Sequence, residues 1–359
     1  MKIAIVTDAW SPQINGVVST LKKTTTYLTS MGHRVAVFNP ADYKTFPMPG
    51  YPEIRLSWFP ARKLSRMLDS FDADAIHIST EGPLGAAARK YCIKRGLKFT
   101  TAYHTRFPEY LRLRVPIPMS LSYWLIRKFH NSSSTTMVAT KSLEDELLSR
   151  NFTNLKRWSR GVDIDLFRPH EKSVIQSELP IAVYLGRVAV EKNIKAFLDL
   201  EINARKVVIG DGPEMGELKS LYPDTLFVGY KTGEELSAHL AAADVMVFPS
   251  LTDTFGLVLL EAMACGVPVA AYPVTGPKDI IENGANGWVD GDLAYAVEQA
   301  LKVDPGKCRE YAEKYSWRNA AKQFYRNLVL VKEDKAQVLD IDNSLQEGVV
   351  AESATRLCD

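Results

Sequence analysis

The sequence predicts an α/β protein made of two doubly wound domains that face each other across a cleft. Short β-branched runs alternate along the chain with segments of 3.6-residue apolar periodicity, a pattern typical of parallel sheets with helices on both faces. Each half holds enough strands for its own sheet, and a length of 359 residues favours two domains over one. Ligands of such folds bind at the carboxyl ends of the strands that line the cleft.

The expected strands are short runs rich in valine, isoleucine and threonine. In the first half they are residues 2–8, 34–39, 74–78, 98–104, 136–140 and 155–158. In the second half they are residues 181–186, 206–210, 225–229, 244–250 and 267–272. Helical segments fall between them, and 20–32 and 234–243 show the periodicity clearly.

The polar segment 160–180 holds two prolines and precedes a new strand, so we place the boundary between the domains there. The predicted organisation is a first domain at 1–163 and a second domain at 164–315. A helix at 316–331 returns to the first domain, and an acidic tail follows at 332–359.

Composition predicts a cytoplasmic protein. No apolar run approaches the 18 or more residues that a membrane-spanning helix needs. Asp8 interrupts the first apolar run, which is not typical of a signal peptide. The four cysteines are scattered without a CxxC pair, so the sequence indicates neither a zinc site nor a disulfide framework.

Positive charge is concentrated in the first half. Residues 1–170 carry 25 Lys and Arg against 13 Asp and Glu, whereas the rest of the chain carries 19 against 29. This asymmetry favours an anionic partner for the first half. Two solvated surfaces that differ by chance are the alternative.

The segment TDAWSPQINGVV follows the first strand and opens a helix. Gly16 lets the backbone pass close to a ligand, and Asn15 is of a type that accepts a left-handed backbone. Free N–H groups at a helix start suit phosphate. An ordinary strand–helix turn is the alternative.

Loops after successive strands of the second half carry further candidate binding residues. Arg187 and Lys192 in YLGRVAVEKN form a pair of cations that suits a diphosphate. Gly210 lies in VIGDGPE and Tyr230 in FVGY, where glycines let a flat ligand approach. Each motif is weak by itself, but all lie at carboxyl ends of one predicted sheet.

Asp253 and Glu261 are separated by seven residues of mainly apolar sequence. The turn Phe255-Gly256-Leu257 would begin a helix whose N–H groups suit anions or hydroxyls. Glu261 would lie in the first turns of that helix and need a buried partner. Vicinal hydroxyls of a sugar ring would satisfy both carboxylate oxygens, and Asp253 could reach a second ring.

Together these motifs resemble the family 4 group of retaining, nucleotide-sugar-dependent glycosyltransferases with the GT-B fold, in which two Rossmann-like domains face a cleft. Its two acids separated by seven residues match Asp253 and Glu261, with aspartate where the family usually has glutamate. The segments GRVAVEK, GDGPE and SRGVDIDLFRP are also typical. Asn15-Gly16 departs from the family's common double glycine. The resemblance covers roughly residues 1–330.

The resemblance implies roles for the residues that bind the nucleotide. Glu261 would bind the ribose hydroxyls. Arg187 and Lys192 would hold the diphosphate and stabilise it as the leaving group. Gly16 would offer its N–H group to the same phosphates from the opposite domain.

It also implies roles around the transferred sugar. Asp253 and the amides of residues 255–257 would hold the hydroxyls of the donor sugar. His104 in AYHTRFPEY would lie near the sugar and the reacting face; a structural role is the alternative. Glu81 and Glu109 are candidates on the acceptor side.

The resemblance implies catalysis without a metal, because cationic side chains stabilise the leaving-group charge. Three DxD triplets occur, at 72–74, 163–165 and 340–342. None is expected near the diphosphate, so we expect neither a metal nor another cofactor.

Two segments of the first half combine aromatic and cationic residues, which suits an anionic bilayer surface. Residues 107–130 include Arg112, Arg114, Tyr123 and Trp124, and residues 58–68 begin with Trp58. A core helix with solvated ends is the alternative. We expect a peripheral protein on the inner face of the cell membrane, with a lipid acceptor and no nucleic acid partner.

The sequence also resembles the family branch that makes glycolipids, including sulfoquinovosyl- and glucosyl-diacylglycerol synthases, and nearly as well the bacterial α-mannosyltransferases. The prediction is a transferase that moves a hexose from a UDP-glucose-type donor to a lipid such as diacylglycerol. A GDP-mannose-dependent α-mannosyltransferase acting on a glycolipid or a soluble glycan is the alternative. An enzyme that only hydrolyses the donor also fits the motifs.

Overall fold

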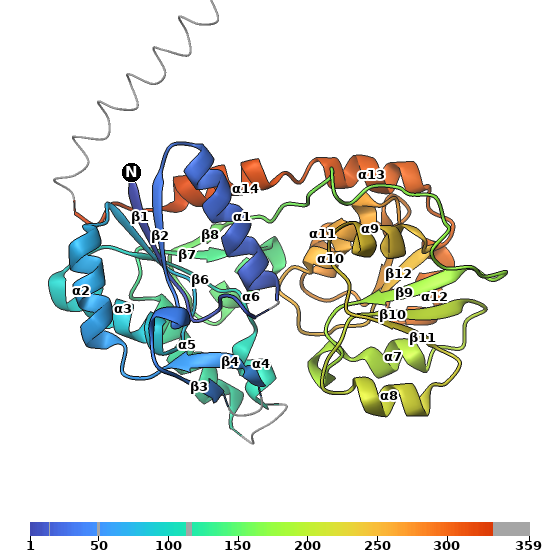
Figure 1. Ribbon diagram of the computed structural model, residues 1–359, viewed down its shortest axis with the longest axis horizontal. Coiled ribbons are helices and arrows are strands. Elements are labelled where there is room, and N and C mark those ends of the chain that lie inside the picture. Colours follow the sequence, from blue (N-terminus) through green and yellow to red (C-terminus); the bar gives the residue numbers. More distant parts are fainter. Residues whose placement is uncertain (14, 49–50, 113–116, 333–359) are drawn as a thin grey trace, which may run out of the picture.

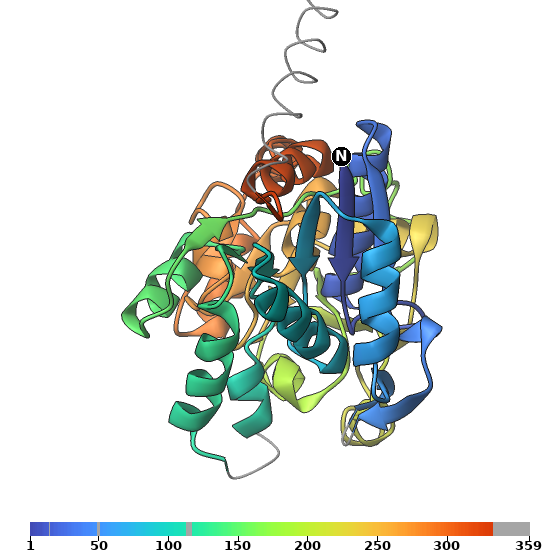
Figure 2. The same cartoon turned by 90° about the vertical axis from the view of Figure 1, so that its left-hand side faces the viewer.

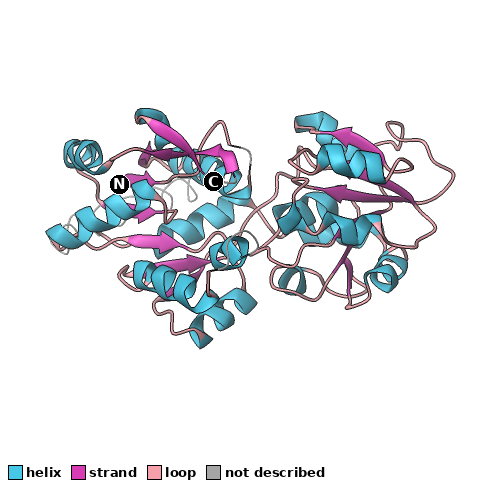
Figure 3. Ribbon diagram, turned by 90° about the horizontal axis from the view of Figure 1, so that it is seen from below, coloured by secondary structure: helices cyan, strands magenta, loops and turns pink. Residues whose placement is uncertain are grey.

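The computed structural model describes residues 1–13, 15–48, 51–112 and 117–332. Its strands form two six-stranded sheets and a separate two-stranded hairpin (Figure 1). The strands of each six-stranded sheet run parallel, and helices cover both faces (Figure 3). The chain therefore has the two doubly wound sheets predicted from the sequence.

The first sheet consists, in spatial order, of β2 (Arg34–Phe38), β1 (Lys2–Val6), β5 (Ala75–Ile78), β6 (Thr100–Ala102), β7 (Thr135–Val138) and β8 (Leu155–Arg157). Its helices are α1 (Gly16–Ser30), α2 (Ala61–Phe71), α3 (Pro83–Arg95), α4 (Phe107–Arg112), α5 (Met119–His130) and α6 (Lys141–Ser149). A 3₁₀ turn, η1 (Pro40–Asp42), and the hairpin of β3 (Thr45–Met48) and β4 (Tyr51–Ser57) precede α2. Ile3 of β1 pairs with Val35 on one side and Ala75 on the other, which fixes the register.

The second sheet consists, in spatial order, of β11 (Leu226–Gly229), β10 (Arg205–Ile209), β9 (Ile181–Leu185), β12 (Val245–Phe248), β13 (Val269–Ala271) and β14 (Gly287–Val289). Its helices are α7 (Ile194–Leu198), α8 (Met215–Leu221), α9 (Gly233–Ala241), α10 (Leu257–Ala264), α11 (Pro277–Ile280), α12 (Leu293–Ala300) and α13 (Pro305–Glu313), with the 3₁₀ turn η2 (Val190–Lys192) after β9. Val183 of β9 pairs with Val207 and Met246.

Central strands of both sheets are buried along their whole length, because helical layers cover both faces of a doubly wound sheet. Every residue of β5, β7, β9 and β12 is buried. In β5 this includes His77, whose Nδ1 lies 2.9 Å from Thr100 Oγ1 in β6. Burial lowers the pKa of His77 to about 3, so it is a neutral residue of the core.

Both sheets change direction of winding beside their first strand, between β1 and β5 and between β9 and β12. Loops on either side of such a point leave toward opposite faces of the sheet and open a crevice at the carboxyl ends of the strands. The motif-bearing loops of the second half follow β9, β10 and β12. The fold therefore gathers residues that are far apart in the sequence at one edge.

After α13 the chain returns to the first sheet, where α14 (Trp317–Asn327) packs beside α1 (Figures 1 and 2). The rings of His33 and Tyr325 stack with their centroids 4.5 Å apart. Trp158 Nε1 donates a hydrogen bond to Ala320 O at 3.1 Å. The C-terminal helix thus contributes to the core of the first half. The expected acidic tail lies outside the described residues, apart from Lys332.

All six predicted strands of the first half and all five of the second are present. The hairpin β3/β4 and the strand β14 were not predicted. β3 contains Pro47, and β14 is only three residues long at the edge of its sheet. Short edge strands carry too few β-branched residues to stand out from the surrounding loops.

Candidate active site

Loops at the carboxyl ends of both sheets contact each other directly. Thr254 Oγ1, in the loop after β12, donates a hydrogen bond to the backbone oxygen of His104, in the loop after β6, at 2.8 Å. At the start of α6, Ser142 N donates to Asp279 Oδ1 at 2.8 Å. Residues of the two halves can therefore act on one ligand between them.

Helix α1 begins with Asn15 as its N-cap. Asn15 Oδ1 accepts hydrogen bonds from Val17 N and Val18 N, both at 3.0 Å, and the φ angle of Asn15 is −160°. Asn15 does not use the left-handed conformation that asparagine accepts, because its side chain caps the helix from an extended conformation. Gly16 is exposed, and a Cβ atom there would lie 3.4 Å from Leu257 Cδ1. The start of α1 thus faces the start of α10.

Lys192 and Asp253 form an ion pair at the carboxyl edge of the second sheet. Lys192 Nζ donates to Asp253 Oδ1 at 2.7 Å and to Oδ2 at 2.9 Å, and both side chains are mostly buried. Burial by itself lowers the pKa of the Lys192 ammonium, but the charge of Asp253 outweighs it and raises that pKa above its ordinary value. The Lys192 ammonium is therefore charged at neutral pH.

Tyr110 of α4 reaches this ion pair from the first half. Its hydroxyl lies beside Thr252, Lys192 and Asp253, and burial raises its pKa. No sequence motif marks Tyr110, because α4 is a single short helix without a recognisable pattern. Only the packing of the two halves brings it to the site.

The loops after β9 and β10 pack closely on each other. Tyr184 OH donates to the backbone oxygen of Arg187 at 2.6 Å, which fixes the loop that carries this arginine. Gly210 has a φ angle of 142°, and a Cβ atom there would lie 1.9 Å from Gly186 O. Glycine at position 210 is therefore required by packing alone. Tyr230 follows the edge strand β11 and is exposed.

The turn before α10 has the form predicted from the sequence. Phe255 is buried, and Gly256 adopts a left-handed conformation with a φ angle of 86°, which glycine accepts without strain. Helix α10 begins at Leu257. The amide groups at its start are among those that a helix cannot bond internally, so they can serve a ligand.

Glu261 lies on α10, among residues that are otherwise apolar. Within the described part of the chain, no donor lies at hydrogen-bond distance from its carboxyl group, and burial raises the pKa of Glu261 to about 7. A partly buried carboxylate without donors costs free energy. A ligand that brings hydroxyl groups would remove that cost.

His104 is neutral and has one unsatisfied nitrogen. Its Nδ1 lies 3.3 Å from Arg160 Nη2, and its ring packs edge-on against Trp158. Its Nε2 is buried and has no hydrogen-bond partner among the described residues. Burial, followed by the charge of Arg160, holds the pKa of His104 well below its ordinary value.

Both carboxylates predicted on the acceptor side have partners within the first half. Glu81 Oε1 lies 2.9 Å from His130 Nε2. Glu109 Oε1 accepts from Tyr123 OH at 2.5 Å and from Arg106 Nη1 at 3.3 Å. Glu109 Oε2 is buried and has no partner among the described groups. One oxygen of Glu109 therefore lacks a hydrogen-bond donor among the described residues.

Helix α5 has a buried face and an exposed apolar face. Tyr123 lies on the buried face with its hydroxyl on Glu109, so its predicted place on a membrane-facing surface is wrong. The exposed face carries Leu121, Trp124 and Leu125 at positions i, i+3 and i+4, which form one stripe on a helix. A core helix and a membrane-facing segment are the alternatives that the sequence left open for this region. Helix α5 combines both, because one face is buried and the other is exposed.

Other residues of the predicted membrane surface are exposed. Trp58 is 56% exposed and Trp124 is 45% exposed. Lys128 Nζ lies 5.3 Å from the centroid of the Trp124 ring. Arg112 is exposed at the end of α4, whereas Arg114 lies outside the described residues.

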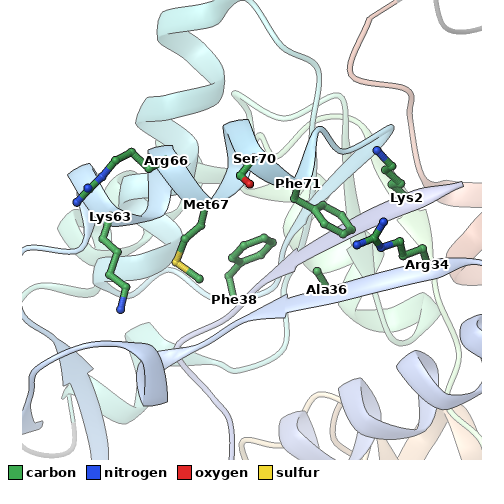
Figure 4. A pocket seen from close by; sticks show the side chains of 9 residues that line it. All are labelled: Lys2, Arg34, Ala36, Phe38, Lys63, Arg66, Met67, Ser70 and Phe71. Atoms are coloured by element: carbon green, nitrogen blue, oxygen red, sulfur yellow. The ribbon is translucent and has the colours of Figure 1, made fainter.

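A groove of about 590 Å³ lies between α2 and the strands β1 and β2 (Figure 4). It is lined by the basic residues Lys2, Arg34, Lys63 and Arg66 and by the apolar residues Ala36, Phe38, Met67 and Phe71, together with Ser70. It contains none of the motif residues of the crevice. It adds two cations, Lys2 and Arg34, to the basic surface of segment 58–68.

Among the residues that the structure describes, no helix is long and apolar enough to cross a bilayer. The same residues contain no cluster of three or more His, Cys, Asp or Glu side chains that could hold a metal ion. Asp163 of one DxD triplet pairs with Lys23 at 2.7 Å, and Asp74 of another accepts from Lys2 N at 2.7 Å. The triplet at 340–342 lies outside the described residues. Catalysis without a metal stays a prediction.

Two family models match adjoining parts of the chain. The model described as Glycosyltransferase Family 4 matches residues 14–166, and the model described as Glycosyl transferases group 1 matches residues 167–315. Between them they cover nearly all of both sheets. The chain belongs to glycosyltransferase family 4. Members of this family are retaining enzymes, and the protein transfers a sugar from a nucleotide sugar donor.

This family 4 glycosyltransferase is similar to enzymes that differ in the sugar they are named for. Sulfoquinovosyl transferase SQD2 of Arabidopsis thaliana is 31% identical over 77% of this chain and 60% of the plant protein, so the match spans less than two thirds of that relative. A GDP-mannose-dependent α-mannosyltransferase of Corynebacterium glutamicum is 28% identical, over 80% of this chain and 76% of the relative. An α-monoglucosyldiacylglycerol synthase of Streptococcus pneumoniae is 28% identical, over 85% and 79%.

The fold of this family 4 glycosyltransferase matches solved GT-B structures. HepE of Anabaena, solved in complex with UDP-glucose, superposes with a TM-score of 0.68 at 16% sequence identity and covers 91% of this chain and 98% of its own. At that identity the comparison shows the fold. The two parallel six-stranded sheets are therefore those of a GT-B enzyme, as the sequence predicted.

Proposed function

We propose that the protein moves a hexose from a nucleotide diphosphate sugar, with UDP-glucose as the favoured type, to a membrane lipid such as diacylglycerol. The observation that carries this proposal is the exposed stripe of Leu121, Trp124 and Leu125 on α5. It lies on a half of the chain that is rich in cations. Exposed apolar side chains beside basic residues suit the surface of an anionic bilayer. A glucosyldiacylglycerol synthase among the relatives supports the same acceptor class.

In this proposal the two halves have separate tasks. Residues 1–163 hold the acceptor, and residues 164–315 bind the nucleotide sugar. Residues 316–331 return to the first domain, in line with the packing of α14 beside α1. The reaction takes place in the crevice between them.

The nucleotide lies along the carboxyl edge of the second sheet. Glu261 accepts hydrogen bonds from the ribose hydroxyls, and this supplies the donors that its carboxylate otherwise lacks. Gly210 and Tyr230 border the nucleotide. Gly16 offers its N–H group to the diphosphate across the crevice, in line with its closeness to Leu257.

Arg187 and Lys192 stabilise the diphosphate as it leaves. Negative charge grows on the phosphates as the bond to the anomeric carbon breaks, and a fixed cation in a partly dry site lowers the energy of that state. Asp253 holds the ammonium of Lys192 in place before the donor arrives. The diphosphate then shares this cation with Asp253. No step of the proposal requires a metal.

The transferred sugar lies over the start of α10. Asp253 and the amides of residues 255–257 bind its hydroxyls, and His104 donates a hydrogen bond from the opposite side. The contact between Thr254 and the backbone of His104 supports this arrangement, because it joins the two sets of residues. On the acceptor side, Glu109 accepts a hydrogen bond from the incoming hydroxyl at the oxygen that has no donor in the ligand-free protein. Glu81 does not contact the acceptor directly and instead orients His130, with which it forms a hydrogen bond.

Membrane contact involves residues 58–68 and 107–130. Trp58 and Trp124 enter the interface, and Arg112 and Arg114 contact anionic headgroups. Tyr123 does not contact the membrane, and its hydroxyl orients Glu109 by donating a hydrogen bond to it. The protein works as a peripheral enzyme on the inner face of the cell membrane.

A second candidate function is a GDP-mannose-dependent α-mannosyltransferase acting on a glycolipid or a soluble glycan. The relative from Corynebacterium glutamicum favours it at nearly the same identity. The two candidates differ in the base and the sugar of the donor, and both use the same crevice.

An array of nucleotide sugars tests both candidates. Each donor is incubated with the full chain, with and without vesicles that contain diacylglycerol, and products are identified by mass spectrometry. A glycosylated lipid formed from UDP-glucose supports the first candidate, and mannosyl transfer from GDP-mannose supports the second. Release of free sugar with every acceptor would show a hydrolase and overturn both.

A further inference from the structure

Arg160 is a buried guanidinium with an unusual set of partners. Its Nη1 donates to Trp158 O at 2.6 Å and to Ser159 O at 3.2 Å, and its cation lies 4.4 Å from the centroid of the Trp158 ring. Within the described residues no carboxylate pairs with it. Burial lowers the pKa of Arg160 to about 9, so the group stays cationic at neutral pH.

The remaining contact of Arg160 defines the state of His104. Arg160 Nη2 lies 3.3 Å from His104 Nδ1. A guanidinium has hydrogen-bond donors and no acceptor, so Nδ1 must be the acceptor and cannot carry a proton. The proton of the neutral ring is therefore on Nε2. Protonation of Nδ1 would break this bond and place two cations side by side.

The free end of the ring is the end that carries the proton. His104 Nε2 is buried and has no partner among the described residues, and a buried donor without an acceptor is unfavourable. The hydrogen bond from Thr254 to His104 O joins the backbone of this residue to the loop after β12. An oxygen atom of a bound donor would satisfy Nε2.

We propose that Arg160 is a positioning residue that fixes His104 as the Nε2–H tautomer, so that His104 donates a hydrogen bond to an oxygen of the transferred sugar and does not act as a base. This inference rests on the proposed function only for the identity of the ligand at His104. It assigns a task to the arginine of the SRGVDID segment. The sequence by itself assigned no role to the residues of that segment.

The backbone around Arg160 is held firmly enough for such a task. A Cβ atom at Gly161 would lie 2.4 Å from Trp317 N, so the chain is wedged against the start of α14. Val162 forms a bridge with Ser316. Arg160 is therefore fixed by the segment that connects the two sheets.

Nitrogen-15 NMR of the histidine side chains tests the tautomer in the ligand-free full chain. The groups that face His104 are Arg160, His77 and His130, so His104 is assigned by comparison with His104→Gln. We expect His104 to show one protonated nitrogen, Nε2, and no titration between pH 5.5 and 8. A proton on Nδ1, or a midpoint within that range, would overturn the inference whatever the enzyme's substrate is.

Two substitutions of Arg160 separate positioning from folding. Arg160→Met removes the donor to Nδ1, and we expect His104 to populate both neutral tautomers and kcat/KM for the donor to fall about tenfold or more. Arg160→Lys keeps a cationic donor and should restore the single tautomer. Arg89→Met is the matched control, because Arg89 also donates to backbone oxygens of the first half, at Lys128 and Phe129. An unchanged His104 spectrum in folded Arg160→Met would contradict the proposal.

The two amide substitutions of His104 give an independent readout. The amide nitrogen of glutamine lies near the place of Nε2, and that of asparagine lies near the place of Nδ1. We expect His104→Gln to keep at least tenfold more kcat/KM than His104→Asn. The reverse order would show that donation from Nδ1 matters and would overturn the assignment.

Discussion

Lys192 and Asp253 stand 61 positions apart in the sequence, yet Lys192 Nζ donates to both carboxylate oxygens of Asp253, at 2.7 and 2.9 Å. The cation proposed for the diphosphate is therefore already matched by a carboxylate in the ligand-free protein. A diphosphate carries more negative charge than one aspartate, so it can compete for the ammonium. The pair holds a charged lysine in a mostly buried place where an isolated one would be unfavourable.

The first prediction concerns this pair as a unit. Lys192→Met should lower kcat by about 100-fold, the effect of losing one pre-organised electrostatic contact. It should also destabilise the protein by about 2 kcal/mol, because it leaves Asp253 mostly buried without its partner. The double substitution with Asp253→Asn should recover much of that stability and none of the activity.

Urea unfolding and initial rates of the four members of the cycle measure both effects. Lys195→Met is the control, since Lys195 is an exposed lysine of α7 that pairs with Glu217. Additive losses of stability in the double variant would mean that the pair is not energetically coupled. Normal turnover in Lys192→Met and in Arg187→Ala would remove both residues from the leaving-group role.

The second prediction concerns nucleotide binding by Glu261. Its pKa of about 7 means that the carboxyl group is only partly ionised at neutral pH. Ribose hydroxyls bind the ionised form better, so the affinity for the nucleotide diphosphate should rise between pH 6 and pH 8. Glu261→Gln should weaken binding and abolish this dependence, whereas Asp253→Asn should leave the pH dependence in place. Calorimetry at three pH values decides, and loss of the pH dependence in Asp253→Asn would show that the roles are misassigned.

The third prediction concerns stability and the same carboxyl group. Its pKa in the folded protein lies above the ordinary value of 4.5, so the folded state binds the proton more tightly than the unfolded chain does. This contribution to stability is fully present below about pH 4.5 and is lost as pH rises to about 7. Between pH 5 and pH 8 the protein should therefore lose about 2 kcal/mol relative to Glu261→Gln. Parallel curves for the two proteins would contradict the burial of this group.

The fourth prediction contrasts two glycines. Gly16→Ala should fold normally, since its Cβ atom would meet only Leu257 at an ordinary 3.4 Å, but it should weaken donor binding if phosphate approaches the start of α1. Gly210→Ala should destabilise the protein, because its Cβ atom would lie 1.9 Å from Gly186 O. Thermal unfolding and titration with the nucleotide separate the two effects. Normal donor affinity in Gly16→Ala would place the phosphates elsewhere.

The fifth prediction concerns the membrane. Binding to anionic vesicles should weaken as salt rises, because the Debye length shrinks to about 3 Å at 1 M. Trp58→Ser with Trp124→Ser should remove the binding that survives high salt, and Arg62→Ala with Arg66→Ala should remove the salt-sensitive part, at about 1 kcal/mol for each cation. Co-sedimentation with neutral and anionic vesicles measures both. Leu148→Ser, an exposed residue of α6, is the control. If vesicle binding does not depend on lipid charge or on any of the four substitutions, the membrane proposal is wrong and a soluble glycan becomes the expected acceptor.

The sequence by itself determined the two parallel sheets, since buried β-branched runs and periodic helices each have a local signature. It also determined the family, because GRVAVEK, GDGPE and the spacing of Asp253 and Glu261 are local patterns. The turn at Gly256 followed from the same segment, where a left-handed residue precedes α10. These features depend on neighbours in the chain, so they can be predicted from it.

Only the tertiary structure decided which of these residues meet. It joined Lys192 to Asp253 and brought Tyr110 to them from the other half. It buried Tyr123 while leaving Trp124 exposed on the same helix, and it set Arg160 against His104. The physical reason is that charge pairing, burial and tautomer depend on distances between segments that are far apart in the chain. Those distances are set by how the two halves pack, and local sequence patterns do not reveal them.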